Sequence, residues 1–142
     1  MVRQVLLFAL LSTVALAQLV NVSEDAKKGK IELGKEFKGH FTYYEDGGYG
    51  ACGSKINAKK EKLVAISSQY FTNKNRSKDP ACDNVCLEVR YKDKKIKVPV
   101  KDECPPCAKN HMDLSLAAYK ALEPNTDIGD VTKNVYFKFV NC

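Results

Sequence analysis

The chain has 142 residues, of which 23 are Lys or Arg and 17 are Asp or Glu, giving a net charge of +6. A chain of this length is expected to form one small domain. The basic balance favours attraction to anionic surfaces such as acidic polysaccharide, cell wall or phospholipid, although a soluble basic surface without a specific anion explains it equally well. No stretch is apolar over the roughly 20 residues that a spanning helix needs, so the sequence argues against a membrane span.

Residues 1–17 have the pattern of a secretory signal peptide. Arg3 supplies a positive charge, residues 5–11 are apolar, and residues 15–17 offer small side chains for cleavage. Gln18 is therefore expected to begin the mature chain, and the protein is expected to be secreted and extracellular. A membrane anchor is the alternative, but the apolar stretch is too short to span a bilayer. Export also argues against nucleic acid as a partner.

Six cysteines form an even set, which in an oxidising compartment predicts three disulfides. They are Cys52, Cys82, Cys86, Cys104, Cys107 and Cys142. A zinc site built from four of these thiols is one alternative, and a redox role for the pair Cys104 and Cys107 is another. Both fit an exported protein less well than disulfides do. The spacing alone leaves about 15 connectivities open.

The first half of the mature chain begins with a polar segment. Residues 18–37 are rich in Lys and Glu, with few large apolar residues in phase, and predict a flexible arm or pro-segment. Asn21 and Asn75 each begin an acceptor pattern for N-glycosylation.

Residues 41–44 are aromatic and β-branched and predict the first strand. Residues 63–66 form a short apolar run that suits a buried strand or a helix fragment, and flanking turns favour the strand.

The second half has clearer periodicity. Residues 86–101 alternate apolar and polar side chains on both sides of Lys92 and Asp93, which predicts a hairpin with a basic outer stripe. Residues 114–122 predict a helix that Asp113 or Ser115 can cap. Residues 135–140 predict a last strand. Many short strands and one helix suggest a small barrel.

Several motifs occur in an order that resembles a known superfamily. They are Thr42-Tyr43-Tyr44, Gly50-Ala51-Cys52-Gly53, the run from Val100 to Cys107, Asp113-Leu114-Ser115, and Phe139-Val140-Asn141-Cys142. Together they resemble the rare-lipoprotein-A-like double-psi β-barrel superfamily, which includes barwin, the first domain of expansins and family-45 endoglucanases. The resemblance implies a mainly β fold over residues 38–142: a six-stranded double-psi β-barrel with one or two short helices, stabilised by disulfides.

The resemblance also implies how the cysteines pair. Carried over from barwin, it implies the disulfides Cys52–Cys82 and Cys86–Cys142. The remaining pair, Cys104–Cys107, departs from barwin and is similar to small fungal relatives. This short pair is expected to fix the shape of one loop.

Asp113 is the candidate with the strongest chemical implication. The resemblance places it where family-45 endoglucanases and lytic transglycosylases carry their general acid, which needs a raised pKa. The alternative is that Asp113 caps the following helix, which would lower the pKa of its carboxyl. We favour a structural or sugar-binding role for Asp113.

Two further carboxylates are weaker candidates. Asp46 matches the spacing of the base in family-45 enzymes, but it precedes Gly47-Gly48, where Asp is a common turn residue. Asp102 lies in the loop of the Cys104–Cys107 pair and is expected to hydrogen-bond within it. An inverting glycosidase needs both an acid and a base, so the enzyme hypothesis is the weaker one.

The expected binding groove combines polar residues from three motifs. They are Thr42, Tyr44, Asp102, His111 and Asp113. Five aromatic residues are expected to offer faces for sugar rings, although alternation along the first strand requires either Tyr43 or Tyr44 to face the core. They are Tyr43, Tyr44, Tyr49, Tyr70 and Phe71. His40 and His111 are expected to act as separate surface hydrogen-bonding residues. No metal site and no cofactor are expected, because no third ligand stands at a recognisable spacing.

Three functions follow from these observations. The first is a monomeric secreted protein that binds cell-wall polysaccharide, of the chitin, glucan or peptidoglycan type, without hydrolysis. The second is a module that binds an extracellular protein, such as a cysteine-protease inhibitor or a host-directed effector. The third is a glycosidase or lytic transglycosylase that uses Asp113 as its acid. The sequence does not choose between sugar and protein as the partner.

Overall fold

The computed structural model describes residues 26–142. Its strands are β1 (Lys27–Lys28), β2 (Ile31–Glu32), β3 (Glu36–Lys38), β4 (His40–Tyr44), β5 (Val64–Ser67), β6 (Val85–Tyr91), β7 (Lys94–Cys104), β8 (His111–Ser115) and β9 (Val135–Asn141). Its helical elements are α2 (Leu116–Leu122) and the short 3-10 turns η1 (Ser68–Tyr70), η2 (Arg76–Lys78), η3 (Pro80–Cys82) and η4 (Thr126–Ile128).

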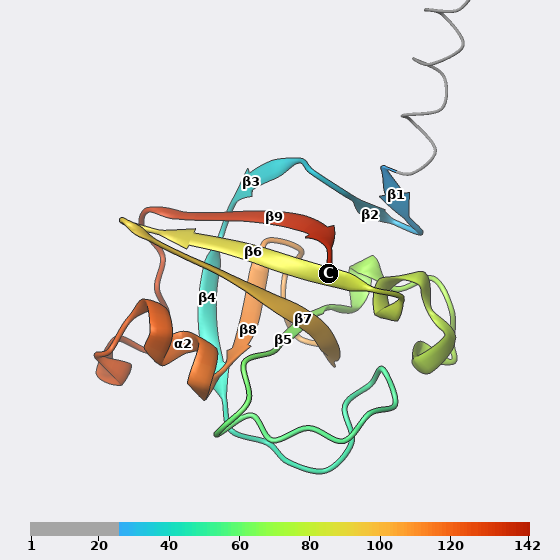
Figure 1. Cartoon of the computed structure of the whole chain (residues 1–142), viewed down its shortest axis with the longest axis horizontal. Helices are drawn as coiled ribbons and strands as arrows, with labels where there is room; N and C mark the ends of the chain where they lie inside the picture. The colour runs from blue at the N-terminus through green and yellow to red at the C-terminus, as the bar shows by residue number, and fades with distance from the viewer. Residues whose placement is uncertain (1–25) are drawn as a thin grey trace, which may run out of the picture.

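Strands β3 to β9 form one curled sheet in the order β3-β9-β6-β7-β5-β8-β4. Figure 1 shows β6, β7 and β9 crossing in front of β4 and β8, with α2 beside them. The pairs β4–β8 and β5–β7 are parallel, whereas β6 pairs antiparallel with both of its neighbours. The predicted mainly β barrel is confirmed. β3 joins its six strands as a seventh at the sheet edge, through pairing with β9.

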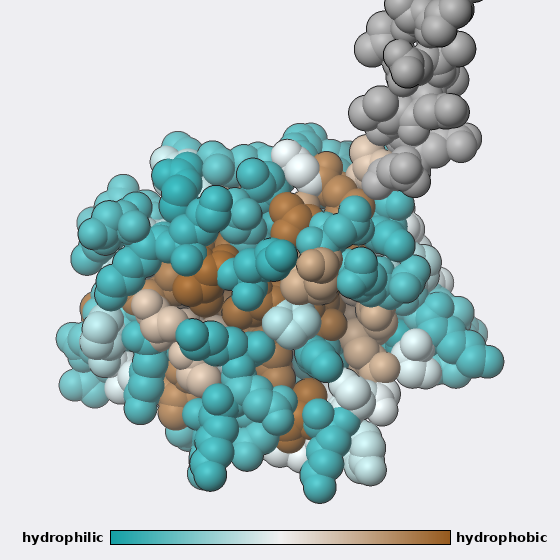
Figure 2. Space-filling model, in the orientation of Figure 1, coloured by the Kyte–Doolittle hydropathy of each residue, from teal (hydrophilic) through white to brown (hydrophobic). Residues whose placement is uncertain are grey.

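The predicted hairpin is present as β6 and β7. Leu87 and Val89 are fully buried, while Arg90 points outward and pairs with Glu36. The turn contains Lys92 at φ 53°, a left-handed conformation that a tight connection requires. On the face of the molecule seen in Figure 2, hydrophilic residues lie around the edge, and hydrophobic residues are visible between them.

For residues 63–66 the sequence left two alternatives, and residues 64–66 belong to strand β5, with Leu63 directly before it. All residues of β5 are buried. Val64 and Ile66 pack into the main core, whereas Ala65, on the opposite face of the strand, packs into the smaller cluster with Cys104 and Cys107. A short apolar run with polar ends is typical of such a fully enclosed strand. The strand prediction is confirmed.

The predicted helix begins later than expected. Its first residue is Leu116, and Leu114 lies in β8 opposite Tyr43 of β4. Ser115 is the cap, because its hydroxyl accepts a hydrogen bond from the backbone N–H of Ala118. Asp113 is therefore no helix cap, and that alternative for it was wrong.

The flexible arm was wrong for residues 26–37. Ile31 is completely buried, and β3 pairs with β9 from Glu36 to Lys38. The sequence pattern missed these strands because they are only two or three residues long and most of their side chains are exposed. The signal peptide, residues 18–25 and Asn21 lie outside the described residues.

Three disulfides join the cysteines as the resemblance implied. Cys52 pairs with Cys82, Cys86 with Cys142, and Cys104 with Cys107. The first connects the loop after β4 to η3, and the second ties β6 to the end of β9. Within residues 26–142, no helix is long and apolar enough to cross a bilayer.

Candidate functional site

Parallel pairing of β4 and β8 brings the predicted polar residues together. Thr42 lies opposite Asp113 in the register of the two strands. The Thr42 hydroxyl donates a hydrogen bond of 2.9 Å to Asp113 Oδ1 and lies 2.8 Å from His111 Nε2. Alternate residues of each strand face the core, so Phe41 and Met112 are buried while this polar set is half-buried.

His40 and His111 are neighbours, which the sequence analysis did not foresee. Their rings stack with centroids 4.2 Å apart, because the two residues are register partners in β4 and β8. His40 Nδ1 also lies 2.7 Å from Asp130 Oδ1. Burial lowers the pKa of His111, the adjacent His40 lowers it further, and Asp130 opposes this effect. His111 is therefore disposed to stay neutral.

The surroundings of Asp113 favour the protonated form of its carboxyl. Burial raises the pKa of its carboxyl, and the nearby charges of Asp46 and Asp102 add to this, while the Thr42 hydrogen bond opposes it. A carboxyl in this environment keeps its proton to a higher pH than a solvated one. This shift is the opposite of what a helix cap would produce.

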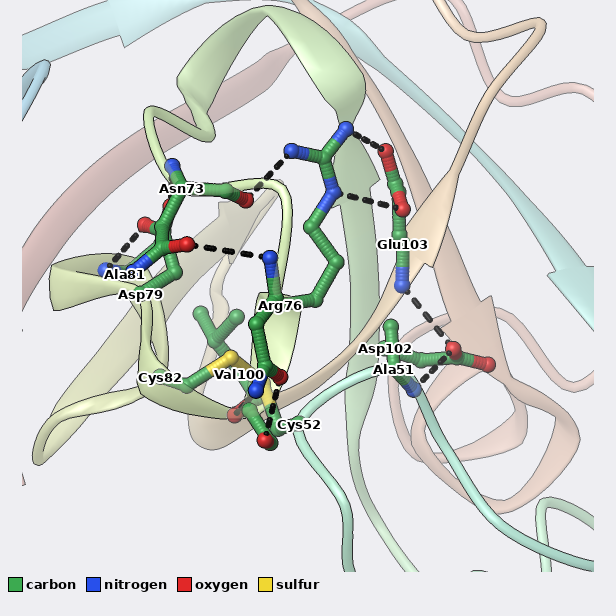
Figure 3. The surroundings of a disulfide bond; sticks show 12 residues. Ala51, Cys52, Asn73, Arg76, Asp79, Ala81, Cys82, Val100, Asp102 and Glu103 are labelled. Carbon is green, nitrogen blue, oxygen red and sulfur yellow. Dashed lines mark hydrogen bonds and ion pairs between the residues drawn. A yellow bond between two sulfur atoms is a disulfide. The ribbon is translucent and has the colours of Figure 1, made fainter.

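Asp102 is occupied as a structural acceptor. Its Oδ1 accepts hydrogen bonds from the backbone N–H groups of Ala51 at 2.8 Å and Glu103 at 2.9 Å. Its Oδ2 accepts one from Tyr44 at 3.0 Å. Burial, followed by the charge of Asp102, raises the pKa of the Tyr44 hydroxyl. Asp102 thus joins β4 and the loop of Ala51 to its own strand, instead of bonding only within its own loop. Its contacts with Ala51 and Glu103 are drawn in Figure 3.

Asp46 lies on the exposed loop after β4. Its backbone carbonyl accepts a hydrogen bond from Ala58 N at 2.9 Å, and Gly48 nearby adopts a left-handed φ of 79°. The residue thus occupies the irregular, glycine-containing loop that the sequence predicted. The weaker hypothesis that Asp46 acts as a catalytic base is not tested by these contacts.

A cluster that sequence analysis missed supports the loop carrying Cys82. Asp79 is almost completely buried and accepts backbone hydrogen bonds from Thr72, Asn73 and Ala81. Burial alone would raise its pKa, but these donors lower it overall. Next to it, Arg76 donates two hydrogen bonds to Glu103 (Figure 3). The sequence offered only one hint, the Asp-Pro pair that begins η3.

The expected aromatic surface is mostly buried. Tyr70 and Phe71 belong to the core, and burial raises the pKa of Tyr70 to about 12. Tyr43 packs against the main core, and Tyr44 packs against the smaller cluster that contains Cys104 and Cys107. Tyr49 differs from these four residues because it is 77% exposed. The expectation of several exposed aromatic faces was therefore wrong.

Two remaining predictions concern bound groups. No cluster of three or more His, Cys, Asp or Glu side chains suited to a metal gathers within residues 26–142. The cysteines considered as zinc ligands are all in disulfides. Asn75 is exposed at the start of η2, where its side chain accepts a hydrogen bond from Ser77. Glycosylation at Asn75 stays a prediction.

Comparison with known proteins gives one family and several relatives. A family model described as lytic transglycolase matches residues 36–132. A papain inhibitor from Streptomyces mobaraensis is 41% identical over 133 residues, which are 94% of this chain and 92% of that protein. A homolog of the allergen Asp f 7 from Arthroderma benhamiae is 31% identical over 87 residues, which are 61% of this chain but 29% of that protein.

Solved structures agree with these matches. A Streptomyces papain inhibitor superposes with a TM-score of 0.75 at 45% identity, covering 78% of this chain and 99% of that one. A Clavibacter michiganensis expansin, solved as a point mutant with cellohexaose, superposes with a TM-score of 0.56 at 24% identity. That match covers 76% of this chain and 50% of the expansin, and it shows the fold alone.

Proposed function

This chain belongs to the rare-lipoprotein-A-like double-psi β-barrel family, and we propose that it is a secreted inhibitor of papain-like cysteine proteases. The observation that carries the proposal is the similarity to the Streptomyces mobaraensis papain inhibitor, which extends along nearly the full length of both chains. The solved structure of a Streptomyces papain inhibitor supports the proposal as well, because the match covers 99% of that structure. Three disulfides agree with export, because such bonds persist in oxidising compartments.

The scaffold suits an inhibitor because its loops are ordered before binding. The loop after β4 is held by Cys52–Cys82, and the loop after β7 is closed by Cys104–Cys107. A surface that is already fixed loses less conformational freedom when it meets a protease, so more of its contact energy appears as affinity.

Polysaccharide binding, the first expectation from sequence, has less support. Packing of sugar rings needs exposed aromatic faces, and four of the five aromatic residues considered for this role are buried or half-buried. The expansin with cellohexaose shares the fold with this chain at 24% identity and carries no argument about its ligand. The comparisons favour the protein-binding alternative.

The test is steady-state inhibition of papain by the purified mature protein on a small peptide substrate. We expect Km to rise with inhibitor concentration while kcat stays constant, because a protein seated in the cleft excludes the substrate. Trypsin, a serine protease, serves as the control enzyme and should keep its activity. Unchanged papain kinetics at a large molar excess of the protein would rule the proposal out.

Glycan cleavage by Asp113 is the second candidate, favoured by the raised pKa of that carboxyl and by the description of the matching family model. We expect no soluble oligosaccharide from peptidoglycan or a β-1,4-glucan. The reason is that Asp102 is committed to three hydrogen bonds and Asp46 lies on an exposed loop. Product release that Asp113→Asn abolishes would establish the enzyme instead.

A further inference from the structure

Tyr49 is exposed to solvent in the loop that follows β4. The residue is 77% exposed, and among the described residues only Ile128, at 47%, is a second exposed large hydrophobic residue. A single exposed apolar side chain is ordinary by itself. What distinguishes Tyr49 is the rigidity of the backbone that carries it.

Hydrogen bonds across the loop fix the backbone on both sides of Tyr49. Tyr49 and Lys55 form an antiparallel bridge. Gly50 N donates to Ser54 O at 3.0 Å, and Ile56 N donates to Gly48 O at 2.8 Å. Ile56 is 3% exposed, so its buried side chain anchors the returning arm of the loop. The loop is a small closed structure.

The base of the loop is attached to β7. Gly50 lies so close to this strand that a Cβ atom would stand 2.3 Å from Lys101 O, which only glycine avoids. Ala51 N donates to Asp102, as described above, and Cys52 N donates to Lys101 O at 3.3 Å. The disulfide with Cys82 then fixes Cys52, the residue that follows Ala51 (Figure 3).

We propose that Tyr49 is the anchor residue with which this protein enters the substrate cleft of a papain-like protease. This inference rests on the proposed function. A tyrosine contributes a large apolar area at a small entropic cost, since it has two side-chain torsions to fix. Buried aromatic residues of this kind dominate the binding energy of protein interfaces. The fixed loop presents the ring without further ordering, so we expect the ring to bind an apolar subsite of the cleft at little entropic cost.

The clamped loop from Cys104 to Cys107 is the competing contact. Pro105 and Pro106 are exposed between the two buried cysteines. They offer less apolar area than a tyrosine and no aromatic ring. Asp102 hydrogen-bonds to Ala51 in the Tyr49 loop and lies two residues before Cys104, so the two loops are linked at their bases. We therefore assign the clamp a peripheral position in the interface.

The experiment measures the Ki for papain of four forms of the mature protein: wild type, Tyr49→Ala, Tyr49→Phe and Ile128→Ala. We expect Tyr49→Ala to raise Ki at least about 30-fold, as truncation of a central aromatic anchor does. Tyr49→Phe keeps the ring and should stay within about 5-fold of wild type by the same reasoning. Ile128→Ala removes the other exposed hydrophobic residue and should leave Ki unchanged. Thermal unfolding should be the same for all four forms, because both sites are exposed.

The outcomes separate this inference from the proposed function. If wild type inhibits papain and Tyr49→Ala inhibits equally well, Tyr49 is no anchor while the protein is still an inhibitor. In that case a Pro105→Ala, Pro106→Ala double variant identifies whether the clamp carries the contact. If wild type fails to inhibit, both the proposed function and this inference are overturned. A Ki that rises equally for Tyr49→Ala and Ile128→Ala would also contradict the inference, because it would reflect a nonspecific loss of surface apolarity.

Discussion

The hydroxyl of Thr42 donates a 2.9 Å hydrogen bond to Asp113 across two parallel strands. The same pairing of β4 and β8 places Asp113 within the sheet, two residues before the serine that caps α2. The carboxyl is consequently shielded from water without receiving the backbone donors of a helix end. Its pKa is raised for that reason. The same environment determines how the stability of the protein should change when the carboxyl is replaced.

Asp113→Asn is expected to preserve or increase stability at neutral pH. The pKa of Asp113 in the folded protein is raised above its ordinary value of 3.8. The folded state therefore holds the proton more tightly than the unfolded state, and stability falls as pH rises through the folded pKa. The amide removes that penalty while keeping an acceptor for Thr42.

Thermal unfolding of wild type and Asp113→Asn across a pH series checks this prediction. The difference in midpoint should disappear at pH values below about 3, where the wild-type carboxyl is protonated in both states. A variant that is less stable than wild type at neutral pH would contradict the assigned environment of Asp113.

Ser115→Ala is expected to destabilise the protein by about 2–3 kcal/mol. The hydroxyl of Ser115 is completely buried and accepts hydrogen bonds from Leu63 N at 3.0 Å and Ala118 N at 3.2 Å. Its loss removes a helix cap and leaves a buried N–H group unpaired. Urea denaturation measures the effect, with Ser77→Ala as the exposed control, for which a change within about 0.5 kcal/mol is expected. Equal effects of the two substitutions would show that Ser115 is not the cap.

Sequence periodicity predicted the elements that depend on regular burial. The alternation of Leu87 and Val89 with charged residues predicted the hairpin, because one face of each strand meets the core. The helix boundary was two residues early because Leu114 fits an apolar helical spacing as well as a strand facing β4 and β5. Only the pairing of β8 with its neighbours decides between them.

Contacts between distant segments could not be predicted from the residues alone. His40 and His111 are separated by most of the barrel in sequence, yet they stack because their strands are parallel and in register. Asp79 gave no periodic signal, since its partners are backbone N–H groups of an irregular loop. The disulfides were predicted from the family resemblance and not from spacing.

Removing the two kinds of disulfide should have unequal effects on stability. Cys86–Cys142 joins residues 56 apart in sequence, and Cys104–Cys107 joins residues 3 apart. A Cys86→Ala, Cys142→Ala variant is expected to lose about 3–4 kcal/mol, because the long loop in the unfolded chain is no longer constrained. A Cys104→Ala, Cys107→Ala variant should lose about 2 kcal/mol or less. Urea midpoints of the two variants give the comparison, and a larger loss from the short loop would contradict it.

Active-site titration of papain tests the central claim most directly. A fixed amount of papain, counted by an irreversible active-site reagent, is mixed with increasing amounts of the purified mature protein, and the remaining activity is measured. The account predicts a linear fall in activity that reaches its floor near one inhibitor molecule per active site, with the inhibitor recovered intact. Full papain activity at a large molar excess of the protein would contradict the account.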